Sequence, residues 1–182
     1  MDFPTLLSLV ILAIVVIAIA KTAQIVPQRS AYVVERLGRF HSVLDAGFHL
    51  MIPFVDKVSY KHTLKEEAID VPQQACVTKD NIQIHVDGVI YMQVIDPKLA
   101  SYGIEDYRFG AIQLAQTTLR SVIGKIELDK SFEERSAINE KVVEVLSEAS
   151  EPWGIKVLRY EVADIVLPET IRDALEKQMR AE

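Results

Sequence analysis

Cysteine and basic charge are both scarce in this chain. Its 182 residues include a single cysteine, Cys76, which excludes an intramolecular disulfide and gives no cysteine-based zinc framework. Lys and Arg number 20 against 26 Asp and Glu, so the net charge is −6. Because general nucleic-acid binding requires a basic field, the composition argues against a nucleic-acid partner.

The motifs of common catalytic sites are absent as well. The sequence has no Gly-x-Ser-x-Gly elbow, no glycine-rich phosphate loop and no His-Glu-x-x-His. No nucleophile and base can be paired along it, and its four histidines lack the spacing of metal ligands. We therefore predict no enzymatic activity and no catalytic, metal or cofactor site. The histidines are His41, His49, His62 and His85.

What the chain does have is an uncharged apolar run from Phe3 to Ala20, closed by Lys21. At about 1.5 Å rise per residue, a helix of this length approaches the roughly 30 Å hydrocarbon core of a bilayer. The alternative is a cleaved signal peptide, which wants a basic leader where this chain has the acidic Asp2. We predict a retained transmembrane anchor at residues 1–21, with apolar positions Phe3, Leu6, Leu9, Ile11, Ile14, Val16 and Ile19.

Basic residues follow the apolar run and none precedes it: they are Lys21, Arg29, Arg36 and Arg39. The positive-inside rule then places the amino terminus outside and the following domain in the cytoplasm.

The first part of that domain is predicted to be rich in β-structure. Apolar residues alternate with polar ones from Ile82 to Val94, a period of two that favours a strand over a helix. Shorter strands are expected at 31–36, at 55–60 and at 68–71, the last ending before Pro72. These strands form a predicted membrane-proximal subdomain at residues 22–95.

An apolar cluster within this subdomain has two interpretations. It is either a surface that touches lipid headgroups or an ordinary core strand and loop. Its residues are Phe48, Leu50, Met51, Ile52 and Phe54.

The second part has helical periodicity. Apolar residues recur at three-and-four spacing from Asp106 to Gly124, and Ser131 with Glu134 resembles a capping box that begins another helix. A strand is expected from Ile155 to Val166. The sequence thus predicts an α/β subdomain at residues 96–167.

A last helix is predicted at residues 168–182, with Ile171, Leu175 and Met179 four residues apart on one face. No cap or stop precedes Glu182. This pattern is typical of the start of a coiled coil, and we expect the three residues to mediate oligomerisation.

The order of these elements, and many of the residues themselves, resemble the stomatin/prohibitin/flotillin (SPFH, band 7) family. The similar segments cover nearly everything after the anchor. Residues 100–106 and 158–161 are similar to the paraslipin (stomatin-like) branch, and the lack of an Arg- and Ser-rich leader favours a prokaryotic member. The other similar segments are 34–40, 46–49, 52–54, 70–72, 77–81, 113–124 and 153–157.

The resemblance implies an α+β fold: a transmembrane helix, an SPFH domain of two α/β subdomains, and the start of a long coiled-coil helix. It also implies a membrane-anchored scaffold that homo-oligomerises into a large ring or cage and organises a membrane microdomain or encloses membrane proteins. Expected partners are further copies of the chain, lipids, and an NfeD-type membrane protein or a membrane protease. The expected location is the bacterial inner membrane. The alternative function is that of a regulatory accessory subunit of a membrane protease or channel.

Overall fold

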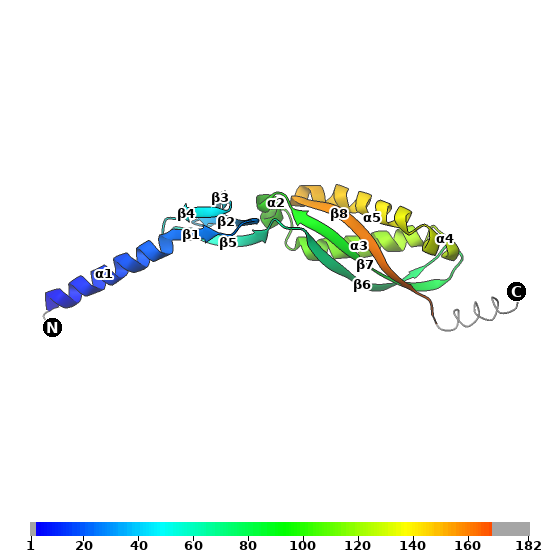
Figure 1. Cartoon of the computed structure of the whole chain (residues 1–182), viewed down its shortest axis with the longest axis horizontal. Coiled ribbons are helices and arrows are strands. Elements are labelled where there is room, and N and C mark those ends of the chain that lie inside the picture. Colours follow the sequence, from blue (N-terminus) through cyan, green and yellow to red (C-terminus); the bar gives the residue numbers. More distant parts are fainter. Residues whose placement is uncertain (1–2, 169–182) are drawn as a thin grey trace. The chain divides into compact units, whose positions relative to one another are not determined.

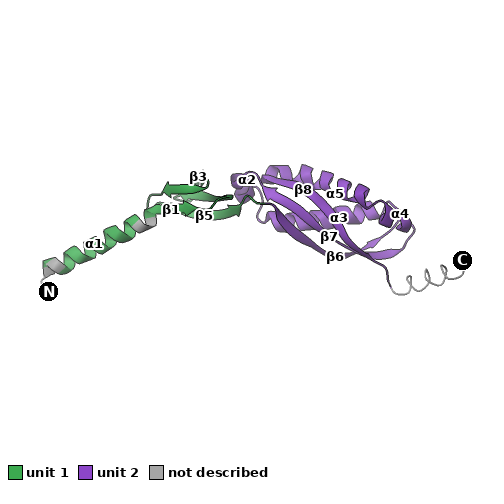
Figure 2. Cartoon of the chain, in the orientation of Figure 1, with its two compact units in different colours: residues 1–65 green, residues 66–182 purple. Residues whose placement is uncertain are grey.

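The computed structural model describes residues 3–168, which belong to two compact units divided between Lys65 and Glu66 (Figures 1 and 2). Unit 1 is Met1–Lys65 and unit 2 is Glu66–Glu182. The predicted oligomerisation residues Ile171, Leu175 and Met179 lie outside the described residues.

Unit 1 begins with helix α1, Phe3–Thr22, a 20-residue helix where the anchor was predicted. Six of the predicted anchor side chains are at least half exposed, and the side chain of Phe3 lies outside the described part. Among the described residues, no helix is both long and apolar enough to cross a membrane. The six are Leu6, Leu9, Ile11, Ile14, Val16 and Ile19.

Two small antiparallel sheets complete unit 1. Strand β1 (Ala23–Val26) pairs with β4 (Gly47–Leu50), and β2 (Ser30–Arg36) lies between β3 (Arg39–Leu44) and β5 (Asp56–Thr63). The buried side chains are small or β-branched, as suits thin sheets: Val26, Ala31, Val33 and Val34.

Unit 2 is built on a three-stranded antiparallel sheet in the order β6-β7-β8. The strands are β6 (Glu67–Val77), β7 (Gln83–Val94) and β8 (Ile155–Val166). The period-two prediction for residues 82–94 is confirmed by β7, which buries every second residue. The unit boundary differs from the predicted division at residue 95, because β7 pairs with β6 on one side and, on the other, with β8, some 60 residues further along the chain.

Pro72 does not end a strand, as the sequence suggested, but lies inside β6. Pro72 has no backbone N–H to donate, and it lies in a bulge between Val71 and Gln74 where the strand pairing is interrupted. In addition, β6 is an edge strand, where proline is tolerated. The side chain of Gln74 donates to the carbonyl oxygen of Gln116 and accepts from Arg120 Nη2 at 3.1 Å, while Gln116 donates to the carbonyl oxygen of Pro72. The bulge is therefore tied to a helix.

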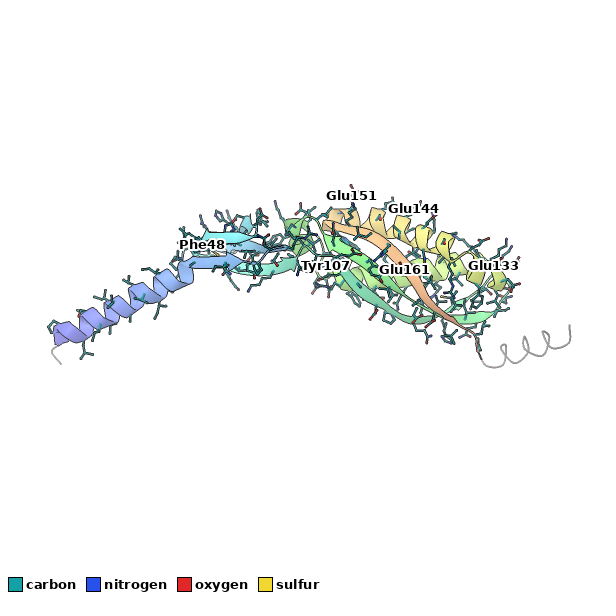
Figure 3. The ribbon with its side chains drawn as sticks, in the orientation of Figure 1. Phe48, Tyr107, Glu133, Glu144, Glu151 and Glu161 are labelled. Carbon is teal, nitrogen blue, oxygen red and sulfur yellow. The ribbon has the colours of Figure 1, made fainter. Side chains whose placement is uncertain are left out.

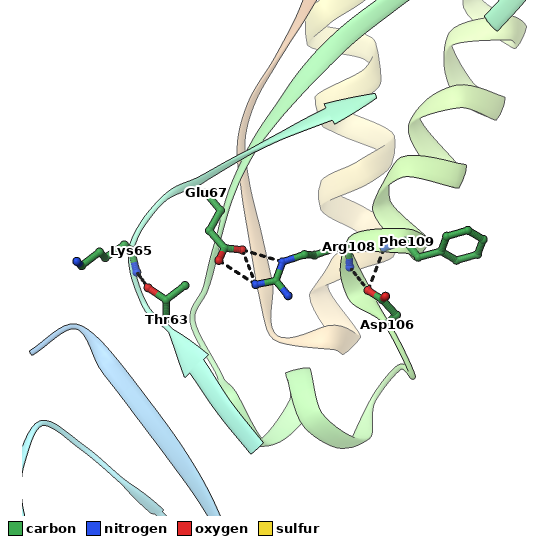
Figure 4. A network of polar contacts seen from close by, with 6 residues as sticks. All are labelled: Thr63, Lys65, Glu67, Asp106, Arg108 and Phe109. Carbon is green, nitrogen blue, oxygen red and sulfur yellow. Dashed lines mark hydrogen bonds and ion pairs between the residues drawn. The ribbon is translucent and has the colours of Figure 1, made fainter. Parts of the chain in front are cut away.

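That helix is α3 (Tyr107–Ile123), which begins and ends as its sequence predicts. Asp106 accepts from the backbone N–H groups of Arg108 and Phe109, and Gly124 follows the last turn. Arg108 also forms a bidentate pair with Glu67 on β6, with Nη2–Oε1 at 2.8 Å (Figure 4).

The remaining helices are α2 (Pro97–Tyr102), α4 (Leu128–Glu133), α5 (Arg135–Ser150) and the 3₁₀ turn η1 (Glu151–Trp153). The predicted capping box is wrong: Ser131 lies inside α4 and donates to the carbonyl oxygen of Glu127. The short helix α4, in which Leu128 is buried, precedes α5 in the chain, and α5 starts at Arg135 without a side-chain cap.

Helices α3 and α5 pack against each other, α3 against β6 and α5 against β8 (Figure 1). The core lies between these helices and the inward face of the sheet. Its largest buried side chains are Ile84, Ile90, Met92, Leu119, Ile123, Ile138, Leu146 and Tyr160.

Candidate functional site: the exposed apolar surface of unit 1

The ribbon formed by β1 and β4 has one apolar face that is open to solvent. Ile25 lies directly opposite Phe48, and Ala23 lies opposite Leu50. Residues two apart on a strand share a face, so these four side chains form one surface. Ile25 and Leu50 are each 72% exposed and Phe48, labelled in Figure 3, is 63% exposed. We call these four residues the ribbon face.

The ribbon face follows α1 without an intervening loop. Thr22 ends the helix and Ala23 begins β1, while the backbone N–H of Met51 donates to the carbonyl oxygen of Thr22 at 2.8 Å. This bond ties the end of β4 to the end of the helix. The exposed apolar surface of α1 and the ribbon face are therefore held next to each other along the chain.

A second apolar pair lies on two turns. Leu37 is 81% exposed between β2 and β3, and Phe54 is 82% exposed between β4 and β5. Both have positive φ, 49° and 67°, a region that costs a bulky residue about 1–3 kcal/mol. They line a common groove of about 340 Å³, and the Leu37 N–H donates to the carbonyl oxygen of Val55 at 3.3 Å. We call Leu37 and Phe54 the turn pair.

An ion pair joins the two chain segments that carry the turn pair. Arg36 donates from Nε and Nη2 to the two carboxylate oxygens of Asp56, at 2.6 and 3.0 Å, and the Ile52 N–H donates to Asp56 Oδ2 at 2.8 Å. The hydrogen bonds from Arg36 and from the Ile52 backbone lower the pKa of Asp56 to about 2. Asp56 thus connects the residue before Leu37 with the loop that carries Phe54.

Of the five residues predicted for this surface, Phe48, Leu50, Ile52 and Phe54 are exposed and Met51 is half-buried. Their contact with lipid stays a prediction. Sequence reasoning missed Ile25, which is followed directly by Val26, and Leu37, a single apolar residue between Arg36 and Gly38. An exposed Leu before Gly38 in a tight turn was the one signal available for Leu37.

The exposed side chains of the ribbon face and the turn pair are apolar, so this surface is suited to binding hydrocarbon. Covering one exposed Leu, Ile or Phe side chain fully is worth roughly 1.5–3 kcal/mol. Within residues 3–168, no group of three His, Cys, Asp or Glu side chains is placed to hold a metal. Cys76 is buried in unit 2, and this burial raises the pKa of its thiol, the opposite of an activated nucleophile.

Comparison with known proteins places the chain in a family. The profile of the SPFH domain / Band 7 family matches residues 24–182, and the chain belongs to this family. It is 46% identical over 157 residues to human mitochondrial stomatin-like protein 2, which is 86% of this chain and 44% of that protein. The stomatin-like branch predicted from the sequence is confirmed.

Two other relatives are similar to the chain over most of its length. The stomatin-like protein STL-1 of Caenorhabditis elegans is 46% identical over 157 residues, 86% of this chain and 48% of that protein. An uncharacterised protein of Mycobacterium bovis is 40% identical over 174 residues, 96% of this chain and 45% of that protein. The chain therefore spans about half the length of the curated relatives it matches.

Proposed function

We propose that this chain is a membrane-anchored scaffold that assembles with copies of itself. SPFH family proteins are membrane-associated scaffolds, and the chain belongs to that family. The observation that carries the proposal is the run of exposed apolar surface from α1 into the ribbon face. Surface of this kind on a folded chain marks a place where another apolar phase or partner binds.

In this proposal the anchor is the whole apolar segment from Phe3 to Ala20, some of whose side chains lie outside the described part. At about 1.5 Å per residue, a helix of this segment approaches the roughly 30 Å hydrocarbon core. All backbone N–H and C=O groups of a helix interior are paired, as lipid requires. The ribbon face and the turn pair then lie at the level of the headgroups, where aromatic and aliphatic side chains can enter the interface.

The exposed Arg29 and Arg39 follow the helix closely, which favours a cytoplasmic domain behind a single span with its amino terminus outside. The bacterial inner membrane is the location that we propose. A reporter active only in the periplasm, fused after Glu182, should stay silent, and an active reporter would mean the opposite orientation.

Self-assembly is the second part of the proposal. Its support is the family and the apolar spacing of Ile171, Leu175 and Met179, read from the sequence. A large ring or cage would gather lipids or enclose membrane proteins, with an NfeD-type protein or a membrane protease as candidate partners. A stoichiometric protease or channel recovered from membranes would instead favour an accessory subunit.

Carbonate extraction of membranes tests the anchor. The full chain should stay in the pellet, whereas Ile11→Arg with Ile14→Arg should release it. Each Arg at the centre of a span costs about 2.5–3.5 kcal/mol for insertion. The matched control is Ile11→Leu with Ile14→Leu, which keeps the helix apolar and should stay in the pellet. Release of the wild-type chain would reject the anchor.

A further inference from the structure

Helix α5 of unit 2 has an apolar groove along each flank. The first, about 410 Å³, lies against β8 and has Val143 and Leu158 in its floor. The second, about 340 Å³, lies against α3 and has Val122, Ile126 and Val145 in its floor. We call them the β8 groove and the α3 groove.

The β8 groove is acidic. Glu140 and Glu144 line it, both exposed on α5. Its one basic lining residue, Arg159, is engaged elsewhere: the guanidinium lies 4.1 Å from the centre of the Tyr91 ring and 3.4 Å from Glu66 Oε1. Glu140 has no ion pair within residues 3–168.

The α3 groove is basic. Lys125 and Lys141 line it, and it has no acidic lining residue among those the structure describes. Lys141 reaches over α5 to Glu144 at 2.7 Å, but both side chains are more than half exposed, so this pair contributes little. In the described part of the chain, Lys125 makes no ion pair.

We propose that the β8 groove of one copy docks on the α3 groove of the next, with Glu140 facing Lys125 of its neighbour. This inference rests on the self-assembly proposed above and names its contact. The occupant is a second copy because one chain carries both halves of a charge-complementary surface: two grooves with apolar lining residues, one flanked by Glu and the other by Lys.

The contact is heterologous, since two different surfaces meet. When two copies dock, one keeps a free α3 groove and the other keeps a free β8 groove, so the same contact can repeat from copy to copy. Such a series closes into a ring when its rotation allows and otherwise grows as a filament. A two-fold symmetric dimer that used this contact would occupy both grooves of each copy at once, pairing Lys125 with Glu140 twice, and would stop at two copies.

Cross-linking the full chain in detergent tests the pairing. Lys125→Cys and Glu140→Cys variants are prepared separately, with the buried Cys76 left in place. A short bis-maleimide should give a covalent dimer in the mixture and none with either variant alone. The wild-type chain is the control for reaction at Cys76.

Charge reversal gives an independent readout. Lys125→Glu and Glu140→Lys should each lower the mass measured by light scattering, and mixing the two variants should restore it through the swapped pair. Asp70→Lys, exposed on the outer face of β6, is the matched control and should leave the mass unchanged.

Two results would overturn the contact while leaving self-assembly intact. One is a wild-type oligomer whose mixed cysteine variants give no covalent dimer. The other is a covalent dimer formed by either single variant alone, which would show that like residues face each other rather than Lys125 and Glu140. A wild-type chain that stays monomeric would reject self-assembly itself, and this contact with it.

Discussion

Arg36 and Asp56 are joined by two hydrogen bonds, and through them the two strained turns that expose Leu37 and Phe54 are held together. Arg36 ends β2 and Asp56 begins β5, so the pair closes the end of the central sheet of unit 1. The Asp56 side chain is only 4% exposed, and its carboxylate also accepts from the Ile52 backbone. A single carboxylate thus connects the two turns that carry Leu37 and Phe54.

The stability of unit 1 should therefore fall in acid. The pKa of Asp56 is lowered from 3.8 to about 2 in the folded chain, so its contribution is present above the ordinary value and is lost as the pH falls toward 2. Thermal unfolding followed by circular dichroism should show a steeper loss between about pH 4 and pH 2 in the wild type than in Asp56→Asn. Identical pH profiles for the two proteins would contradict this role.

Membrane contact by the ribbon face can be read from tryptophan fluorescence. In a Trp153→Phe background, Phe48→Trp supplies the only tryptophan of the chain. In vesicles that contain brominated lipid we expect its emission to be quenched and shifted to the blue. Phe109→Trp, exposed on α3 and part of neither apolar surface, should be quenched far less. Equal quenching at the two positions would count against the ribbon face.

We expect Phe54 to destabilise the folded chain, because its backbone has a positive φ. Asn tolerates the left-handed region better than any other residue except Gly, so Phe54→Asn should raise the free energy of unfolding by about 1 kcal/mol. Phe54→Ala removes the same ring, but Ala lacks the local hydrogen bonding by which Asn tolerates this backbone conformation. Its free energy of unfolding should therefore rise less than that of Phe54→Asn. Chemical denaturation of both variants tests this, and a destabilised Asn variant would mean that the ring packs on something essential.

Gly88 on β7 leaves room for Tyr160. A Cβ at position 88 would overlap the Tyr160 hydroxyl and lie 2.7 Å from the carbonyl oxygen of Glu161. Gly88→Ala should cost about 1–3 kcal/mol of unfolding free energy, as overpacking does. In the described part of the chain the buried Tyr160 hydroxyl has no hydrogen-bond partner, so Tyr160→Phe should be neutral or stabilising. Urea unfolding of both variants checks these values, and a silent Gly88→Ala would refute the overlap.

Local patterns predicted the elements that depend on local signals. The alternation of β7 and the spacing of α3, with Asp106 before it and Gly124 after it, were confirmed because each is set by neighbours in sequence. The strand from Ile155 to Val166 was confirmed for the same reason.

Long-range pairing could not be predicted in this way. The division at Lys65 follows from β7 pairing with β8, and the passage of β6 through Pro72 depends on a bulge and on Gln116 of a distant helix. Of the candidate surface, Phe48 and Phe54 were evident as part of a cluster. Ile25 was not, because only the register of β1 with β4 brings it opposite Phe48.

The mass of the particle extracted from membranes in mild detergent tests the central claim most directly. The chain weighs 20.5 kDa, so light scattering corrected for detergent should give a protein mass many times larger. Replacing Ile171 and Leu175 together with Asp should reduce that mass while circular dichroism shows folded domains. An extracted wild-type protein of 20.5 kDa would contradict the account of a self-assembling scaffold.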